Sequence, residues 1–414
     1  MGKQVKSICF FLLFLMCICF IAGCTSSQQE KDSETDLKQE QTETTTEEDG
    51  NQSENPDETE EGPVESAFLP HDQKIERQVE ETLSKMTLEE KIGQLIVVGF
   101  SSTKIDSHIK TMIQDYNVGG VILYDRNMES PAQVAQLSKD LQGLAAENNV
   151  PIPLMMSIDQ EGGEIVRMRD KVADKPSQQE LGENADSDAI YETNLQTGKE
   201  LQKMGIQVNH APVLDLSATD SRSFGENPNQ AAEFGMEAIK GLNDSGVTAT
   251  LKHFPGNGRS DVDPHYDSSE VEANQMDLEN NDIFPFKKVI DKVDHNQFFV
   301  MVTHLKYPAY DEEHPASLSP VIIQELLREK LGYQGIVVTD DLEMGAVNQY
   351  YTYQDLGYNT INAGADLLLV CHKLESQSQV IKGIRDAVET DQLTEERIDE
   401  SVKRILTYKF AMGL

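Results

Sequence analysis

The chain has 414 residues, which is enough for one large domain or two ordinary ones. Its formal net charge of −37 would repel DNA, RNA and anionic lipid, so general charge attraction to any of these is excluded. Hydrophobic residues make up only 38% of the chain, a low share that predicts a part outside any folded core.

The N-terminal segment has the pattern of a signal peptide. Lysines at positions 3 and 6 precede an apolar run of about 15 residues, shorter than the roughly 20 of a membrane-spanning helix. The run ends in Ile21-Ala22-Gly23-Cys24, and small residues before a Cys resemble a bacterial lipobox. This resemblance implies a lipoprotein signal peptide at residues 1–23, cleavage before Cys24 and lipid on its sulfur. Ordinary secretory cleavage near the same place is the alternative.

The next segment, residues 24–66, consists mainly of Ser, Thr, Gln, Glu and Asp. It cannot bury enough apolar surface to offset the entropy of ordering it, so we expect a disordered acidic linker. A solvated spacer between membrane and domain is the preferred interpretation, and a binding site for a specific ligand is the alternative.

Residues 67–414 show alternating strand and helix patterns. Thr87-x-x-Glu90 predicts a capping box, Ser130-Pro131 predicts a helix start, and 395–410 predicts a closing helix. The last apolar run leads into Cys371, for which we expect a buried, unpaired thiol. The eight apolar runs expected to be strands lie at 95–100, 120–124, 153–159, 206–213, 248–254, 298–304, 335–340 and 366–371.

Eight strands separated by helices predict one (β/α)8 barrel of the TIM-like α/β class. A doubly wound open sheet is the alternative, and the count of eight and the chain length favour the barrel. Active sites of such barrels form where the C-terminal ends of the strands converge. Polar residues fall at or just beyond these ends: Asp159, His210, Lys252, His253, His304 and Asp340.

Two of these positions offer groups that could bind a sugar. Asp159 could accept hydrogen bonds from two adjacent hydroxyls, with Arg167 and Arg169 adding donors, or it could only cap a helix. Lys252 and His253 could donate to hydroxyls or to a carboxylate. Their alternative roles are a salt-bridged lysine and a core histidine. Adjacent strand residues normally face opposite ways, but the twist at a strand end could bring both to the open end of the barrel.

The pair Asp263-Pro264-His265 places a carboxylate two residues from an imidazole. In a loop, the carboxylate could bind one ring nitrogen while the other faces a substrate, which makes a general acid/base near neutral pH. A metal site is the competing interpretation, because Asp261, Asp263, His265 and Asp267 alternate. Tyr266 stands where a calcium loop needs its glycine, which disfavours that reading.

Asp340 ends the seventh run and is followed by Asp341. A carboxylate in this position could attack the anomeric carbon of a sugar. A structural role is the alternative for Asp340, and capping of the following helix is the role expected for Asp341.

Several motifs in one order resemble the bacterial β-N-acetylglucosaminidases of glycoside hydrolase family 3. They are GGVILYDRN, SIDQEGG, RSFGENP, KHFPGNG followed by DPH, MVTHLKYPAYD with PASLSP, and VVTDDLEMGA. The resemblance spans roughly residues 75–414, and several motifs in the right order are far more specific than any one of them.

The resemblance implies roles for particular residues. Asp340 matches the nucleophile that forms a covalent glycosyl-enzyme, and His265 matches the acid/base with Asp263 as its orienting partner. The residues that match groups holding the sugar are Asp159, Arg167, Arg222, Lys252 and His253. Two departures stand in the loop: Asn257 where the family often has His, and Pro264 where it often has Ser.

The sequence therefore predicts a retaining exo-β-N-acetylglucosaminidase, a β-N-acetylhexosaminidase acting on peptidoglycan-derived or related glycans. No cofactor and no metal is expected, because carboxylate and imidazole supply the chemistry. The expected partners are the glycan and, through lipid on Cys24, the extracytoplasmic face of a bacterial membrane, with no nucleic acid. The alternatives are a β-glucosidase or β-xylosidase of the same family, which the DPH pair disfavours, and a non-catalytic sugar-binding lipoprotein.

Overall fold

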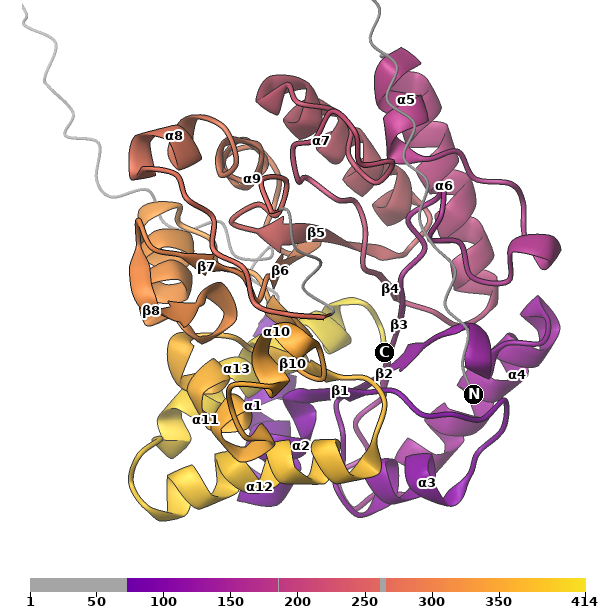
Figure 1. Ribbon diagram of the computed structural model, residues 1–414. Coiled ribbons are helices and arrows are strands. Elements are labelled where there is room, and N and C mark those ends of the chain that lie inside the picture. The colour runs from indigo at the N-terminus through magenta and orange to yellow at the C-terminus, as the bar shows by residue number, and fades with distance from the viewer. Residues whose placement is uncertain (1–72, 185, 261–265) are drawn as a thin grey trace, which may run out of the picture. The chain divides into compact units, whose positions relative to one another are not determined.

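The computed structural model describes residues 73–184, 186–260 and 266–414. The predicted signal peptide, the linker with Cys24, and the pair Asp263 and His265 lie outside the described residues. The described part forms a closed barrel of parallel strands with helices around it (Figure 1).

The predicted (β/α)8 barrel is confirmed. Its strands neighbour one another in the order β1-β2-β3-β4-β5-β6-β9-β10, and β10 pairs with β1 to close the ring. Each strand coincides with one of the predicted runs, and only β9 extends one residue past its run. The barrel strands are β1 (Ile96–Val98), β2 (Gly120–Leu123), β3 (Met155–Ile158), β4 (Val208–Asn209), β5 (Thr248–Phe254), β6 (Phe298–Val302), β9 (Val337–Asp341) and β10 (Leu367–Val370).

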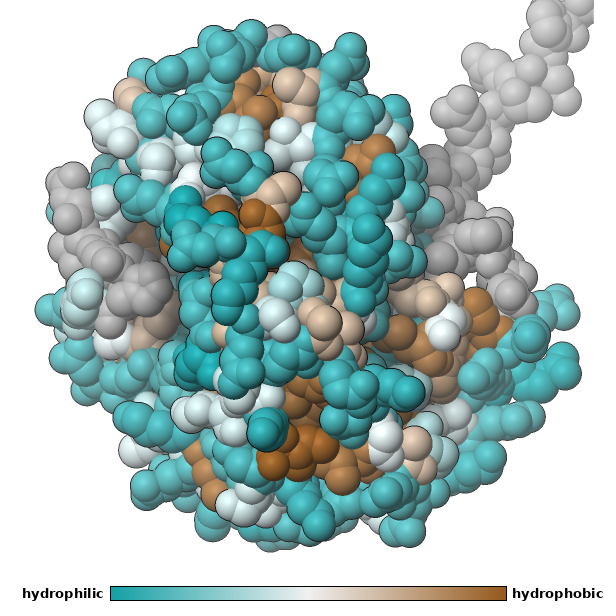
Figure 2. Space-filling model, turned by 90° about the vertical axis from the view of Figure 1, so that its right-hand side faces the viewer, coloured by the Kyte–Doolittle hydropathy of each residue, from teal (hydrophilic) through white to brown (hydrophobic). Residues whose placement is uncertain are grey.

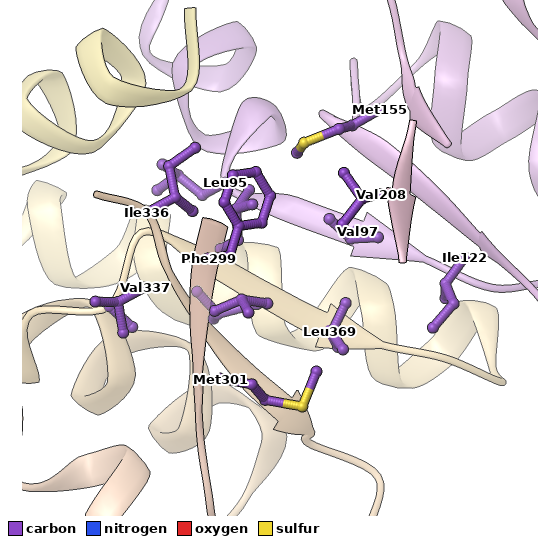
Figure 3. Packing of buried hydrophobic residues seen from close by; sticks show 14 of the residues in the cluster. Leu95, Val97, Ile122, Met155, Val208, Phe299, Met301, Ile336, Val337 and Leu369 are labelled. Carbon is purple, nitrogen blue, oxygen red and sulfur yellow. The ribbon is translucent and has the colours of Figure 1, made fainter. Parts of the chain in front are cut away.

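The strands are apolar throughout because both of their faces are covered, one by the barrel interior and one by helices. Every residue of β1, β2, β3, β6 and β10 is buried. Figure 3 shows Val97, Met155, Val208, Phe299 and Leu369, which come from five different strands, gathered in one apolar cluster. The cluster fixes the ring of strands and therefore the positions of the loops at their C-terminal ends.

The helices begin where the sequence predicts caps. Thr87 and Glu90 form the capping box of α2, and Ser130 caps α4 with Pro131 in its first turn. The α-helices are α1 (Gln73–Leu83), α2 (Leu88–Gln94), α3 (Ser107–Gln114), α4 (Pro131–Ala145), α5 (Gln178–Asn184), α6 (Ser187–Lys203), α7 (Pro228–Asp244), α8 (Gln275–Asn280), α9 (Phe284–Ile290), α10 (Gly345–Asn348), α11 (Tyr353–Ala363), α12 (Leu374–Glu389) and α13 (Glu395–Ala411). Cys371 is buried and unpaired, as predicted.

An antiparallel hairpin that the sequence analysis did not predict is inserted after β6. It consists of β7 (Lys306–Tyr307) and β8 (Asp311–Pro315), and a helix of π geometry, Val321–Lys330, follows it. The backbone of Lys306 also joins the hairpin to the segment after β5. Its N–H donates to the carbonyl of Ser269 at 2.9 Å, and its carbonyl accepts from the N–H of Val271 at 2.8 Å. Strands this short carry no alternating pattern that could reveal them.

Hydrophilic side chains predominate on the face shown in Figure 2, and apolar ones form patches between them. Among the described residues, none of the helices combines the length and the apolar character that crossing a membrane requires.

A buried lysine holds the end of α13 against the barrel. Lys409 is 0% exposed, and its Nζ donates to Gln94 Oε1 at 2.8 Å and to the carbonyl of Gly119 at 2.7 Å. Both partners are neutral, and burial lowers the pKa of Lys409 to about 7. The folded protein therefore binds this proton less tightly than the unfolded chain does.

The free energy of unfolding is expected to rise with pH from about 7 towards 10 because of Lys409, since the unfolded state keeps a proton that the folded state releases. Between about pH 7.5 and about pH 9.5, the free energy of unfolding measured in urea should rise by about 1–2 kcal/mol less in Lys409→Met than in the wild type. The exposed Lys139→Met is the control and should keep the rise. Equal pH dependence in wild type and Lys409→Met would contradict this assignment.

Candidate active site

The open end of the barrel, at the C-terminal ends of the strands, holds a pocket of about 620 Å³. This size lies within the usual range of about 300–1,000 Å³ for small-molecule sites. The pocket brings together all the predicted site residues that the structure describes: Asp159, Arg167, Arg222, Lys252, His253 and Asp340. Asp263 and His265, whose roles stay predictions, lie outside the described residues.

One wall of the pocket is a network of buried charges centred on Lys252. Its Nζ lies 2.9 Å from Asp159 Oδ1 and 2.6 Å from Glu161 Oε1. Arg222 binds Glu161 with two hydrogen bonds, of 2.7 Å from Nε and 2.9 Å from Nη2. Arg167 Nη2 lies 3.6 Å from Asp159 Oδ2. The network fixes side chains from strand β5 and from the loops after β3 and β4, and it still presents Asp159, Arg167 and Arg222 to the pocket.

The network keeps its carboxylates ionised despite their burial. Burial alone would raise the pKa of Glu161, but Lys252 and Arg222 lower it to about 2. Burial acts in the same way on Asp159, and Lys252, His210 and Arg167 together hold its pKa well below the usual value. Asp159 is therefore a permanent hydrogen-bond acceptor at neutral pH, as a sugar-hydroxyl ligand must be.

A second chain of contacts leads to Asp340. Asp215 accepts a hydrogen bond of 2.6 Å from His253 Nδ1 through Oδ2. Its Oδ1 accepts from the backbone N–H groups of His253 at 3.1 Å and Asn257 at 2.7 Å. His253 Nε2 then lies 4.0 Å from Asp340 Oδ2, too far for a direct hydrogen bond. Asp215 thus fixes the ring that stands beside Asp340.

Asp340 stands at the end of β9 with its carboxylate held in the ionised form. Burial would raise the pKa of Asp340, but His253, His304 and the N–H of Asp341 lower it below its ordinary value. That N–H donates to Asp340 Oδ1 at 2.8 Å. An ionised, hydrogen-bonded carboxylate at the floor of a pocket can act as a nucleophile without first losing a proton.

Another wall of the pocket contains an aromatic stack that the sequence analysis did not identify. The rings of Tyr124 and His372 lie 5.8 Å apart at 29°. The guanidinium groups of Arg126 and Arg167 lie 4.3 Å and 5.1 Å from the centre of the Tyr124 ring. His372 Nε2 also lies 3.1 Å from Oδ2 of Asp341, the residue that follows Asp340. The stack therefore connects the end of β9 with Arg167.

Both Lys252 and His253 line the pocket, as expected for a strand end. The register between β5 and β6 shifts between Leu251 and Phe254, so regular alternation of side chains is interrupted there. The peptide bond between Lys252 and His253 is cis.

Some details of the sequence interpretation were wrong. Asp341 does not cap the following helix: its Oδ1 accepts from the N–H groups of Glu343 and Cys371, which ties β9 to β10. Arg169 donates to the carbonyls of Gly163 and Glu164 and does not line the pocket. Arg169 follows a turn whose path the sequence pattern does not specify, and Asp341 is the last residue of β9, three residues before Met344, the residue that precedes α10.

Asn257, where the family often has His, lines the pocket with a buried Oδ1 that has no hydrogen-bond partner among the described residues.

No group of three or more His, Cys, Asp or Glu side chains in the described part is arranged to hold a metal ion. The pocket can therefore offer acceptors, cationic donors and an ionised nucleophile from its own side chains.

Glu161 and Asp215 are two further pocket residues that the sequence analysis missed. Both follow a barrel strand closely, Glu161 three residues after β3 and Asp215 six residues after β4. The rule that selected Asp159 applies to residues at a strand end, and both of these residues lie beyond it in a loop.

A parallel barrel whose open end holds an ionised carboxylate beside a fixed histidine, with a charged network next to them, provides groups of the kind that glycoside hydrolases use. Residues 87–408 match the family described as glycosyl hydrolase family 3 N terminal domain. The chain is 31% identical over 334 residues to the Beta-hexosaminidase A of Pseudoalteromonas piscicida and 32% identical over 322 residues to the Beta-hexosaminidase of Nitrosomonas eutropha. Each match covers 74% of this chain. The chain belongs to glycosyl hydrolase family 3, which confirms the predicted family.

A solved structure gives the same relationship. The family 3 β-N-acetylglucosaminidase from Paenibacillus sp. str. FPU-7 superposes with a TM-score of 0.77 at 39% identity, over 79% of this chain. The chain spans 63% of that protein and 56% of the Pseudoalteromonas protein, but 89% of the Nitrosomonas protein. The Paenibacillus and Pseudoalteromonas proteins therefore contain parts that this chain does not match.

Proposed function

We propose that this protein is a retaining, exo-acting β-N-acetylhexosaminidase that releases terminal β-linked N-acetylglucosamine. The observation that carries the proposal is the ionised carboxylate of Asp340, which lies in one pocket with His253 and the Asp159–Lys252–Glu161 network. The names of the relatives, Beta-hexosaminidase and β-N-acetylglucosaminidase, support the choice of sugar.

The proposed reaction has two displacements. Asp340 attacks the anomeric carbon while the bond to the leaving oxygen breaks, and that oxygen takes a proton from His265, oriented by Asp263. Water then attacks the glycosyl-enzyme and gives its proton to His265, which restores the enzyme and releases the sugar with its original configuration. Asp159, Arg167 and Lys252 bind the hydroxyls, and His253 stands beside the reacting carbon.

The test is the release of nitrophenol from the aryl β-N-acetylglucosaminide and the aryl β-glucoside by residues 67–414. We expect kcat/KM to favour the acetylated sugar by at least about a hundredfold, which corresponds to about 2.7 kcal/mol of transition-state discrimination. Preference for the glucoside would assign the protein to the β-glucosidase activity of the family. Binding of wall fragments without any turnover would indicate a sugar-binding protein.

The natural substrates that we propose are peptidoglycan fragments or related glycans with a terminal β-linked N-acetylglucosamine. The charged wall of Asp159, Lys252 and Glu161 supports this choice, because it offers charged hydrogen-bonding groups to the hydroxyls of a terminal sugar.

We also propose that lipid on Cys24 anchors the protein to the extracytoplasmic face of a bacterial membrane. The apolar run and the sequence Ile21-Ala22-Gly23-Cys24 support this proposal. Cys24→Ala should move the full-length protein from the membrane fraction to the soluble fraction. The control variant Cys371→Ala should stay in the membrane fraction. Continued membrane attachment of Cys24→Ala would contradict the anchor.

A further inference from the structure

A pocket of about 250 Å³, here called the basal pocket, lies at the end of the barrel opposite the active site. Of its lining residues, His295 and Gln334 stand three residues before β6 and β9, and Thr407 and Tyr408 come from α13. The pocket is therefore at the N-terminal ends of the strands. Its volume is below the about 300–1,000 Å³ of usual small-molecule sites, so it suits one or two side chains better than a whole ligand.

The inner wall of the basal pocket is apolar and aromatic. Phe299 and Ile336, both labelled in Figure 3, belong to the apolar cluster of the barrel and also line this pocket. The rings of Phe299 and Tyr408 pack edge to face, with their centres 4.8 Å apart. The Tyr408 hydroxyl donates to Thr248 Oγ1 at 2.9 Å, which fixes the ring. A fixed aromatic pair favours a further aromatic or aliphatic side chain as its neighbour.

Helix α1 brings the N-terminal part of the chain to the same place. It packs against α13, and Glu80 Oε1 lies 3.0 Å from Nζ of Lys403, which lines the basal pocket. From Glu80 back to Gln73 the helix is about 10 Å long, and the five residues from Phe68 to Gln73 can span up to about 17 Å. Phe68 can therefore reach the pocket whichever way α1 runs along α13.

The segment before α1 contains the side chains that the basal pocket could hold. Phe68 is the only aromatic residue between Cys24 and Gln73, and Phe68-Leu69 is the only pair of adjacent large apolar residues there. In a stretch that is otherwise polar, these two side chains gain most from leaving water. Pro70 follows them and restricts the chain, which reduces the entropy lost when the segment is ordered.

We propose that Phe68 and Leu69 dock into the basal pocket of their own chain, with the Phe68 ring beside Phe299 and Tyr408. The acidic linker then leaves the domain at the end opposite Asp340. Docking also shields the junction between linker and domain from proteases, because a protease cleaves only the detached segment. The inference depends neither on the proposed hydrolase activity nor on lipid at Cys24.

The first test measures how fast chymotrypsin cleaves after Phe68 in the full-length protein, from the mass of the released fragment. The rate follows the population of the undocked state. Thr407→Gln enlarges a half-buried side chain of the pocket and should speed this cleavage at least about tenfold, which corresponds to about 1.4 kcal/mol of docking. Thr390→Gln, at an exposed position outside the pocket, is the matched control and should keep the wild-type rate. Cleavage after Glu47 by a glutamate-specific protease should be equal in all three proteins.

A second readout does not depend on a pocket variant. The chain has no tryptophan, so Phe68→Trp introduces a single probe. Its emission should lie at shorter wavelength than that of Leu37→Trp in the linker, and acrylamide should quench it less. Adding Thr407→Gln should remove both differences.

Equal chymotrypsin rates in wild type and Thr407→Gln, with Phe68→Trp emitting like Leu37→Trp, would overturn the inference. Protection of Phe68 that rises with protein concentration, together with a dimer in light scattering, would place the segment in the pocket of a second copy. That result would also overturn docking within one chain.

Discussion

Asp340→Asn is expected to lower kcat at least about a thousandfold on every substrate, because an amide cannot form the glycosyl-enzyme. The fold should survive, since burial of an ionised carboxylate is costly and its removal tends to preserve or raise the melting temperature. The measurement is kcat on the aryl N-acetylglucosaminide with melting followed in parallel. Asp170→Asn, at an exposed position outside the pocket, is the matched control and should retain full activity.

A loss of activity alone would not separate a nucleophile from a structural residue, so the assignment needs a second result. Asp340→Gly leaves space beside the anomeric carbon in which azide can act as an external nucleophile. Azide should restore turnover of a substrate with a good leaving group and give the glycosyl azide of inverted configuration, because only one displacement occurs. Failure of azide to restore turnover, with the sugar still bound, would argue against Asp340 as the nucleophile.

The barrel could be predicted because each of its strands can be recognised from a short stretch of the sequence. Each strand is an apolar run bounded by Gly, Pro or polar residues, and burial of both faces makes such a run recognisable without alternation. The count of eight then selected the closed ring. The hairpin β7–β8 escaped prediction because a strand as short as Lys306–Tyr307 has no periodicity.

The site could be predicted only where a strand directs the side chain. Asp159 and Asp340 stand at strand ends, so their approach to the pocket follows from the barrel itself. Glu161 and Asp215 are carried by loops, and the direction of a loop side chain depends on a backbone path that the sequence pattern does not state. Their roles emerge only from their contacts with Lys252 and His253.

The contact of Lys252 with two carboxylates leads to the second large expected effect. Lys252→Met should destabilise the protein by about 3–5 kcal/mol at neutral pH, because it leaves Asp159 and Glu161 as buried, partly uncompensated charges. Activity should fall as well, since the hydroxyl-binding wall loses its central cation. Urea unfolding and kcat/KM on the aryl N-acetylglucosaminide measure the two effects.

The pH dependence distinguishes this mechanism from a simple packing defect. In the wild type, the lowered pKa values of Asp159 and Glu161 add stability above about pH 4, and this stability is lost as the pH falls towards 2. Without Lys252, burial should raise the pKa of Asp159 above its unfolded value, whereas Arg222 still pairs with Glu161, so the variant loses stability through Asp159 as the pH rises from about 4 to 7. The stability difference should therefore widen over that range, whereas a packing defect would give a constant difference.

A double variant separates the electrostatic role of Lys252 from its role in binding. Lys252→Met with Asp159→Asn removes one uncompensated charge and leaves Glu161 paired with Arg222 at 2.7 Å, so most of the lost stability should return. Activity should stay low, because the hydroxyl-binding cation and its acceptor are both absent. Recovery of stability without activity would show that the charges at the open end of the barrel are kept for the substrate, since the fold can be stabilised without them. A double variant as unstable as Lys252→Met would instead make Lys252 mainly a packing residue.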